Sequence, residues 1–305
     1  FLLVLVQLVI LFAIFLRGVW QHFVVKELDL CRRYGPGSFV VITGPSSGQG
    51  REYALAFAKR GFNLVLIGSK RCPKVAEEIR HLYPNTRIMV IIKNFCHAFE
   101  KGFFDDIEEH LQELDVSVLV NNVAHRKGFF PSHQQPEQEI RDVMACSTMV
   151  QTRLSQICMK LFLRRRPCKS AIICTAALCQ HSCFGFTIGM GGNISLPFVS
   201  IYEPSNSFRF YHAHSLFKEY GHLLDFLIVT PGAVLTDNTR PFLCNTFGAI
   251  ECKDFVGNVL RMVGNVQGEV CGYWKHAAGG YLVNLAPWMK NSILEQTGRD
   301  LATHT

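Results

Sequence analysis

One junction in this chain constrains its fold more than any other feature. An apolar run over 39–42 leads directly into a glycine-rich turn over 43–50, and a helical pattern follows over 51–60. Glycines let such a turn approach a pyrophosphate closely, and the N-terminus of the helix offers free N–H groups and a favourable dipole. The alternative is an ordinary Gly/Ser turn, but the position of these glycines between a strand and a helix favours dinucleotide binding.

Further short apolar runs alternate with helix-like stretches along the chain. They are apolar on both faces, as buried parallel strands are. The runs are 39–42, 64–67, 88–92, 116–120, 171–174 and 226–229. This alternation predicts right-handed βαβ units. We therefore predict an α/β fold, a Rossmann-like doubly wound parallel sheet in three α/β/α layers.

Composition agrees with a large α/β domain. The 305 residues are 49% hydrophobic and 18% charged, which excludes a disordered chain and leaves ample apolar material for a core. The net charge is +7, but the basic residues occur only in twos and threes. Without a long basic run no nucleic acid partner is expected, whereas an anionic cofactor or an anionic membrane surface would suit the charge.

The twelve cysteines include no CxxC pair. The closest spacings, such as those of Cys174, Cys179 and Cys183, have no metal-ligand rhythm with histidine, so no metal site is predicted. We interpret the cysteines as reduced thiols of a protein that faces the cytosol, the alternative being a disulfide framework.

The N-terminal segment is apolar up to Arg17, apart from Gln7. As a helix it would be ~24 Å long, a little short of the ~30 Å hydrocarbon core of a bilayer. It lacks the preceding basic residues and the small-residue cleavage site of a signal peptide. Positive charges follow it at Arg17, Lys26, Arg32 and Arg33, which predicts a membrane anchor with the rest of the chain on the cytoplasmic side. The alternative is a buried core helix.

The end of the second predicted strand bears on the choice of cofactor. In NAD-binding folds an acid there bonds the ribose 2′-hydroxyl, but this chain has no acid at that position. Arg51, Ser69, Lys70 and Arg71 could gather around a 2′-phosphate instead, which favours NADP(H). The alternative is that Lys70 and Arg71 are a solvated turn.

Two motifs together resemble the short-chain dehydrogenase/reductase family over 38–275. They are Thr43-Gly44-x-x-x-Gly48-x-Gly50 and Asn121-Asn122-Val123-Ala124. Other segments are similar to the membrane-anchored branch of 17-beta-hydroxysteroid dehydrogenase type 3 and very-long-chain 3-oxoacyl-CoA reductase: 58–63, 119–123, 200–202, 218–220 and 268–272. The resemblance implies an anchor segment at 1–17, an NAD(P)-binding domain at 38–275 and a C-terminal tail at 276–305 that shapes the substrate pocket or contacts the membrane.

The same resemblance implies a function. It indicates an NADPH-dependent oxidoreductase that reduces a keto group of a steroid, or alternatively a very-long-chain 3-oxoacyl-CoA reductase. The substrate would be a small hydrophobic ketone or alcohol. The resemblance also implies an endoplasmic reticulum membrane location with the catalytic domain facing the cytosol, and a homodimer.

Cofactor contacts follow from the resemblance position by position. Asn94 matches an acid that contacts the adenine, while Asn121 and Val123 match residues that line the adenine ribose and support the central strand. Pro231 and Thr236 match the loop that holds the nicotinamide carboxamide. The expected cofactor-binding residues are Thr43, Gly44, Ser47, Gly48, Gly50, Arg51, Ser69, Lys70, Asn94, Asn121, Val123, Pro231 and Thr236.

The catalytic positions depart from the family pattern. Tyr202 matches the tyrosine that donates a proton to the substrate. An unperturbed tyrosine has a pKa near ~10, and the family lowers it with a lysine one helical turn later. That position is Asn206 here, and Ala177 occupies the position of the serine that polarises the carbonyl. The relay asparagine is also replaced, near Cys146.

Other residues could compensate for these losses. Thr175, Ser182 or Ser195 could stand in for the serine. Arg209, seven residues after the tyrosine, lies on the same helix face and is permanently charged, but its side chain would have to cross two turns. If nothing compensates, the chain is a pseudoenzyme that binds the cofactor without turnover.

Overall fold

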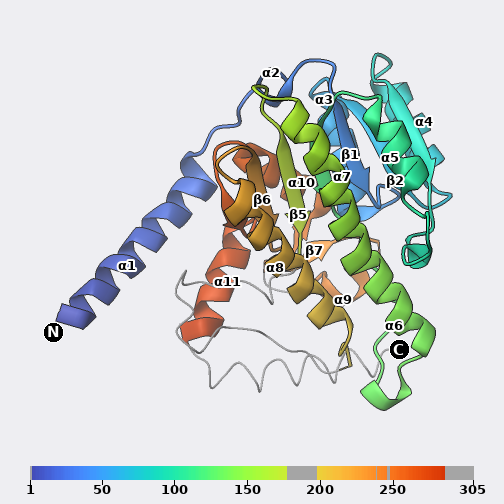
Figure 1. The fold of residues 1–305 in the computed structure, drawn as a ribbon. Helices are drawn as coiled ribbons and strands as arrows, with labels where there is room; N and C mark the ends of the chain where they lie inside the picture. Colours follow the sequence, from blue (N-terminus) through green and yellow to red (C-terminus); the bar gives the residue numbers. More distant parts are fainter. Residues whose placement is uncertain (1, 177–197, 238, 246–247, 286–305) are drawn as a thin grey trace.

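The computed structural model describes residues 2–176, 198–237, 239–245 and 248–285. Seven strands form one sheet in the order β3-β2-β1-β4-β5-β6-β9, and every pair is parallel (Figure 1). The strands are β1 Phe39–Thr43, β2 Asn63–Gly68, β3 Ile88–Ile92, β4 Val116–Asn121, β5 Ala171–Thr175, β6 Asp225–Val229 and β9 Gly268–Val270. The prediction of a Rossmann-like parallel sheet is confirmed.

Each predicted apolar run is a strand, and its ends agree to within one residue. The prediction missed β9 and the small pair β7 Val234–Leu235 and β8 Ile250–Glu251. These strands are two or three residues long. An apolar run cannot be recognised over so short a length, and the pairing with a neighbouring strand defines them instead.

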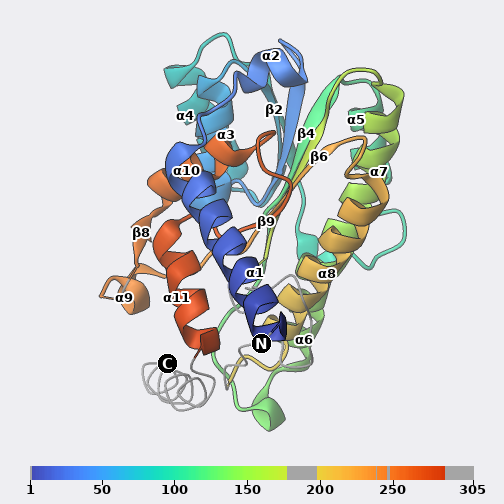
Figure 2. The ribbon, with the colours of Figure 1, turned by 90° about the vertical axis from the view of Figure 1, so that its left-hand side faces the viewer.

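Helices cover both faces of the sheet (Figure 2). The described helices are α1 Leu2–Val19, α2 Leu30–Tyr34, α3 Gly48–Lys59, α4 Cys72–Leu82, α5 Asp105–Gln112, α6 Glu137–Met144, α7 Val150–Arg164, α8 Tyr202–Tyr220, α9 Arg240–Leu243, α10 Cys252–Met262 and α11 Trp274–Leu285. The predicted helix at 51–60 thus begins earlier, inside the glycine-rich turn.

Strand periodicity divides the core into two clusters. In β1, Val40 and Ile42 pack with α3, α4 and α10, whereas Phe39 and Val41 pack with α5, α7 and α8. Successive strand residues point to opposite faces, so a strand buried on both faces is apolar throughout. This is why the continuous apolar runs identified the sheet.

The N-terminal helix α1 projects from the domain (Figure 1). Its apolar side chains are exposed, with Phe12 and Phe15 at 62% and 63% of their full accessibility, which contradicts the alternative of a buried core helix. Among the residues that the structure describes, we find no helix with the length and apolarity needed to span a bilayer.

The short helix α2 is tied to the sheet by a buried polar cluster. Arg33 donates from Nε and Nη2 to the two carboxylate oxygens of Asp225 at 2.7 and 3.1 Å. The Tyr34 hydroxyl donates to the same carboxylate at 2.7 Å, and Gln267 Nε2 donates at 2.8 Å. Asp225 is 3% exposed, and its hydrogen bonds are the main cause of a raised Arg33 pKa. The folding unit therefore includes residues before 38.

Asp225→Asn should lower the free energy of unfolding by about 2–4 kcal/mol, because the buried carboxylate accepts from Arg33, Tyr34 and Gln267 and an amide cannot replace all of these bonds. Urea denaturation measures the loss. Asp115→Asn is the control, because Asp115 also pairs with an arginine, Arg165, but its side chain is 58% exposed. That variant should lose no more than about 1 kcal/mol. Equal losses would show that burial does not strengthen the Asp225 cluster.

Candidate cofactor and catalytic site

Thr43, the last residue of β1, ties β1 to the end of β4. Its buried hydroxyl donates to the carbonyl oxygen of Val120 at 3.2 Å and accepts the N–H groups of Asn122 and Val123 at 2.9 and 3.1 Å. Asn122 Nδ2 donates back to the Thr43 carbonyl oxygen at 3.1 Å. These bonds fix the glycine-rich turn at the carboxyl edge of the sheet, where open α/β sheets bind ligands.

The three glycines of the turn are required by its shape. Gly44 and Gly48 have φ angles of 65° and 55°, in the left-handed region that a Cβ atom disfavours. A Cβ on Gly50 would overlap the Gly44 carbonyl oxygen and lie 2.7 Å from Asn122 Nδ2. Ser47 precedes α3, and its side chain makes no capping hydrogen bond within the described chain. The turn therefore has the close backbone approach that dinucleotide binding requires.

A cavity of about 540 Å³ adjoins this turn. Its lining includes Ser46, Ser47 and Gly48 of the turn, the basic residues Arg51 and Lys74, and Thr236 from the loop after β6. Hydroxyl, backbone N–H and cationic groups are the donors that phosphates bind. The lining also includes the acids Glu52, Glu78, Asp237 and Glu251, so the phosphate donors of the cavity lie on the side of the glycine-rich turn.

The residues expected around a 2′-phosphate are only partly gathered. Ser69 Oγ lies 2.9 Å from Ser46 Oγ, beside the turn. Arg51 lines the cavity but is paired with Glu52 and Glu78. Lys70 and Arg71 are exposed and do not line the cavity. Lys74 was not predicted as a site residue, although its position in the first turn of α4 could have indicated it.

The expected adenine-side residues lie at the carboxyl ends of their strands. Asn94 follows β3, and its Oδ1 accepts the N–H of Cys96 at 3.3 Å. Asn121 is buried and donates from Nδ2 to Ser155 Oγ at 2.9 Å, which holds β4 against α7. Val123 lies against Gly44. The side chain of Asn121 is thus already committed to the scaffold.

The loop expected to hold the nicotinamide is fixed by a buried histidine. His276, in α11, accepts the N–H of Gly232 at Nδ1 (3.2 Å), and its Nε2 donates to the Gly248 carbonyl oxygen (3.1 Å). Burial lowers the His276 pKa, which agrees with a neutral ring. Thr236, in the same loop, lies against Gly48. The loop therefore contacts the glycine-rich turn. No sequence motif around His276 indicated this role.

Tyr202 is the first residue of α8, and the Arg126 guanidinium lies 5.7 Å from its ring centroid. Thr175 ends β5 and is buried. Ala177, Ser182 and Ser195 lie outside the described residues.

Arg209 is a buried cation beside the position of the missing lysine. Only 2% exposed, it donates from Nη1 to Asn206 Oδ1 at 3.3 Å and from Nε to Gln151 Oε1 at 3.3 Å. Its Nη2 donates to the Asn122 carbonyl oxygen at 3.4 Å. These partners are neutral, and no ion pair of Arg209 with a described carboxylate is present. Burying a charge without an anionic partner costs free energy, because bonds to neutral groups replace only part of its hydration.

Helix geometry explains how Arg209 reaches this position. Side chains on a helix point toward its N-terminus, so the guanidinium lies over the preceding turn, next to Asn206. Burial lowers the Arg209 pKa, and the nearby Tyr202 and Cys174 side chains oppose that shift. Arginine nevertheless keeps its charge in proteins. The two-turn separation in sequence is therefore no obstacle to an electrostatic interaction with Tyr202.

Known proteins share the sequence pattern of this chain. The profile of the short chain dehydrogenase family matches residues 38–243. The chain is 26% identical over 298 residues to a very-long-chain 3-oxoacyl-CoA reductase of Emericella nidulans, covering 91% of this chain and 80% of that protein. It is 27% identical over 277 residues to 17-beta-hydroxysteroid dehydrogenase type 3 of Rattus norvegicus, covering 85% and 82%.

Solved structures share the fold. A short-chain dehydrogenase from Sphingobium yanoikuyae in complex with NADPH superposes with a TM-score of 0.62 at 21% identity, covering 82% of this chain and 95% of that one. A 7beta-hydroxysteroid dehydrogenase superposes with a TM-score of 0.71 at 17% identity, covering 90% and 99%. At these identities the likeness shows the architecture alone.

Proposed function

Because the chain belongs to the short-chain dehydrogenase family, we propose that it is an NADPH-dependent reductase of a keto group on a small hydrophobic substrate, a steroid. The observation that carries this proposal is the pairing of an intact cofactor turn with a tyrosine, Tyr202, one helical turn before Asn206, whose side chain accepts from the buried cation Arg209. The steroid is supported by the similarity to 17-beta-hydroxysteroid dehydrogenase type 3.

When bound, the nicotinamide would supply the hydride that the carbonyl carbon accepts. The Tyr202 hydroxyl donates its proton to the carbonyl oxygen as charge develops there, and solvent later returns a proton to Tyr202. The fixed positive charge of Arg209 favours the tyrosinate left behind, in the role that lysine has in the family. The turn 43–50 and the loop from Pro231 to Thr236 would hold the cofactor.

A second candidate substrate is a very-long-chain 3-oxoacyl-CoA, because relatives of that name match over most of the chain. The full chain should bind NADPH and turn over either androstenedione or a long-chain 3-oxoacyl-CoA. The fall in NADPH absorbance measures this turnover. Turnover of only the thioester would replace the steroid proposal. NADPH binding without turnover of either substrate would favour the pseudoenzyme alternative, and no NADPH binding would contradict the interpretation of the glycine-rich turn.

The preference for NADPH over NADH rests on the neutral and basic residues near the second strand. Ser69→Asp places a carboxylate beside the turn, where it would repel a 2′-phosphate and accept a ribose hydroxyl. We expect NADPH affinity to fall by about 10–100-fold, on the scale of 1.4 kcal/mol per tenfold, and NADH affinity to rise. Ser69→Asn is the uncharged control and should retain the NADPH preference. Fluorescence titration with both cofactors measures the ratio, and an unchanged ratio in Ser69→Asp would contradict the assignment.

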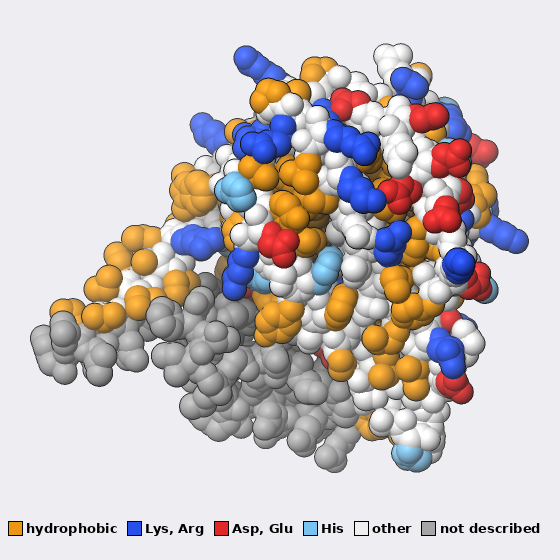
Figure 3. All heavy atoms as spheres, in the orientation of Figure 1, with side chains coloured by type: hydrophobic (Ala, Val, Ile, Leu, Met, Phe, Trp, Pro, Cys, Tyr) orange, Lys and Arg blue, Asp and Glu red, His pale blue; other side chains and the backbone are white. Residues whose placement is uncertain are grey.

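A membrane location is part of the proposal. Hydrophobic side chains run along the projecting α1 (Figure 3), and those of Val9, Phe12 and Phe15 are more than half exposed. Exposed apolar surface of this extent is typical of contact with lipid or a partner. We propose that α1 associates with the cytosolic side of the endoplasmic reticulum membrane. Sedimentation with lipid vesicles tests this association. The homodimer that the family resemblance implies is still a prediction, which analytical ultracentrifugation would test.

A further inference from the structure

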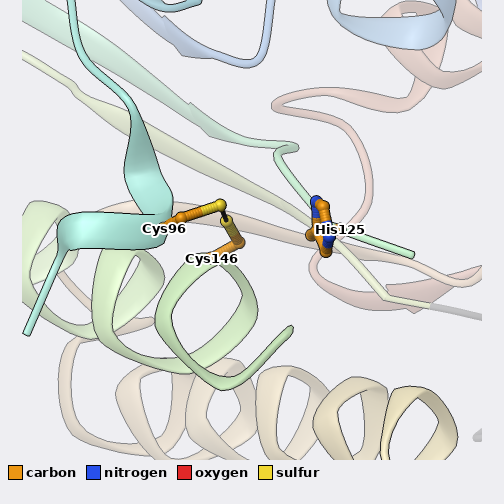
Figure 4. Close-up of side chains that lie close together, drawn as sticks. All are labelled: Cys96, His125 and Cys146. Atoms are coloured by element: carbon orange, nitrogen blue, oxygen red, sulfur yellow. Dashed lines mark hydrogen bonds between the residues drawn. The ribbon is translucent and has the colours of Figure 1, made fainter. Parts of the chain in front are cut away.

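Three potential metal ligands from distant parts of the chain converge beside the sheet (Figure 4). Cys96 lies in the 3-10 turn Phe95–His97 after β3, His125 follows β4, and Cys146 lies in the π-helical turn after α6. The two sulfur atoms are 4.0 Å apart, and one ring nitrogen of His125 and both sulfurs lie within 4.8 Å of one another. The fold therefore assembles a donor cluster that sequence spacing could not show.

Two buried carboxylates lie next to His125 in this cluster. Glu139 Oε2 lies 3.1 Å from His125 Nε2, and Asp142 Oδ2 lies 4.0 Å from it. The two acids are only 5% and 6% exposed. Asp142 also accepts the Gln138 amide at 2.8 Å. The two acids therefore adjoin the thiol pair through the shared imidazole of His125.

This donor set matches the preferences of zinc. Thiolate, imidazole and carboxylate are its usual ligands, and bond lengths of about 2.0–2.3 Å place tetrahedral donor atoms roughly 3.3–3.8 Å apart. The observed separations require only small side-chain adjustments. The two adjoining carboxylates also accept the Lys127 N–H and the Gln138 amide, and a divalent cation nearby would further offset the cost of burying them. Cys96 and His125 are partly exposed, which leaves a path for the ion.

We propose that Cys96, Cys146 and His125 bind a Zn²⁺-class divalent cation, with water in the fourth position and Glu139 orienting the His125 ring. A carboxylate that holds a ligating imidazole is a common outer partner in metal sites. Glu139 is itself fixed, since its Oε1 accepts the N–H of Lys127 at 2.7 Å. This proposal does not depend on the proposed reductase activity.

The test uses the full chain, reduced and stripped of metal, titrated with Zn²⁺ against a chromophoric chelator and separately with Co²⁺. We expect one equivalent of Zn²⁺ and, with Co²⁺, the thiolate charge-transfer absorption of a tetrahedral site. Cys96→Ser and Cys146→Ser should each weaken Zn²⁺ binding by at least about 100-fold, and Glu139→Gln by about 10–100-fold. Cys158→Ser is the matched control, because Cys158 is buried outside the cluster, and it should bind as the parent does.

Three results would overturn the proposal. They are the absence of stoichiometric Zn²⁺ binding by the reduced protein, a Co²⁺ spectrum without thiolate absorption, and equal affinities for Cys96→Ser and Cys158→Ser. Circular dichroism of each variant excludes misfolding as the cause of a loss. Glu139→Gln retains all three proposed protein ligands, so it keeps the proposal testable if a cysteine variant does not fold.

Discussion

Tyr202→Phe should leave NADPH affinity unchanged and lower ketone turnover by about 10²–10⁴-fold, the usual contribution of a positioned general acid. Phenylalanine keeps the ring at the start of α8 and removes only the hydroxyl that would donate the proton. Steady-state kinetics and cofactor titration on the same preparation separate the two effects. The loss should appear as a lower kcat, because the proton is needed only as the transition state forms.

Tyr211→Phe is the matched control for this substitution. Tyr211 lies on the same helix, but it is 55% exposed. Its hydroxyl should be dispensable. If Tyr202→Phe retained parental turnover, another group would have to supply the proton, and the assignment of Tyr202 would be wrong.

Arg209→Met should lower turnover by about 10²–10³-fold while NADPH still binds. Each tenfold loss corresponds to ~1.4 kcal/mol less stabilisation of the tyrosinate. Methionine approximates the length of the arginine stem without its charge. A lost charge also predicts a rescue that a packing defect does not, because a cation returned nearby should restore turnover. Steady-state kinetics and cofactor titration measure the loss and the rescue.

The double variant Arg209→Met with Asn206→Lys returns a cation to the position where the family has one. It should recover much of the lost turnover. Arg153→Met is the control, because Arg153 has a side-chain partner, Gln156, on the surface of α7. A fall in turnover that the added Asn206→Lys does not rescue would make Arg209 a structural residue and leave the reductase proposal to the Tyr202 result.

The sequence predicted what depends on local pattern. Continuous apolar runs located β1 to β6, because a parallel strand is buried on both faces. The turn 43–50 was recognisable because Gly44, Gly48 and Gly50 are fixed by local backbone geometry. Tyr202 followed from the family motif.

The remaining features depend on tertiary packing. Helical periodicity predicted that Arg209 shares a helix face with Tyr202, but only tertiary packing shows that its side chain is buried and bonded to Gln151 and Asn206. His276 acts on a loop that precedes it by about forty residues. The cluster of Cys96 and its neighbours joins segments that no spacing rule connects. Chain distance hides such sites, because a motif is defined over a few residues.

The cluster of α2 with Asp225 has a consequence for protein engineering. The family match begins at residue 38, and a truncation designed on that match would remove both Arg33 and Tyr34. Asp225 would then be an acid in the core with the Gln267 amide as its remaining side-chain partner among the described residues. A shortened protein for crystallisation should therefore begin before Asp29, whose side chain accepts the N–H of Arg32 at the start of α2. The useful expression boundary lies upstream of the dehydrogenase domain as sequence families define it.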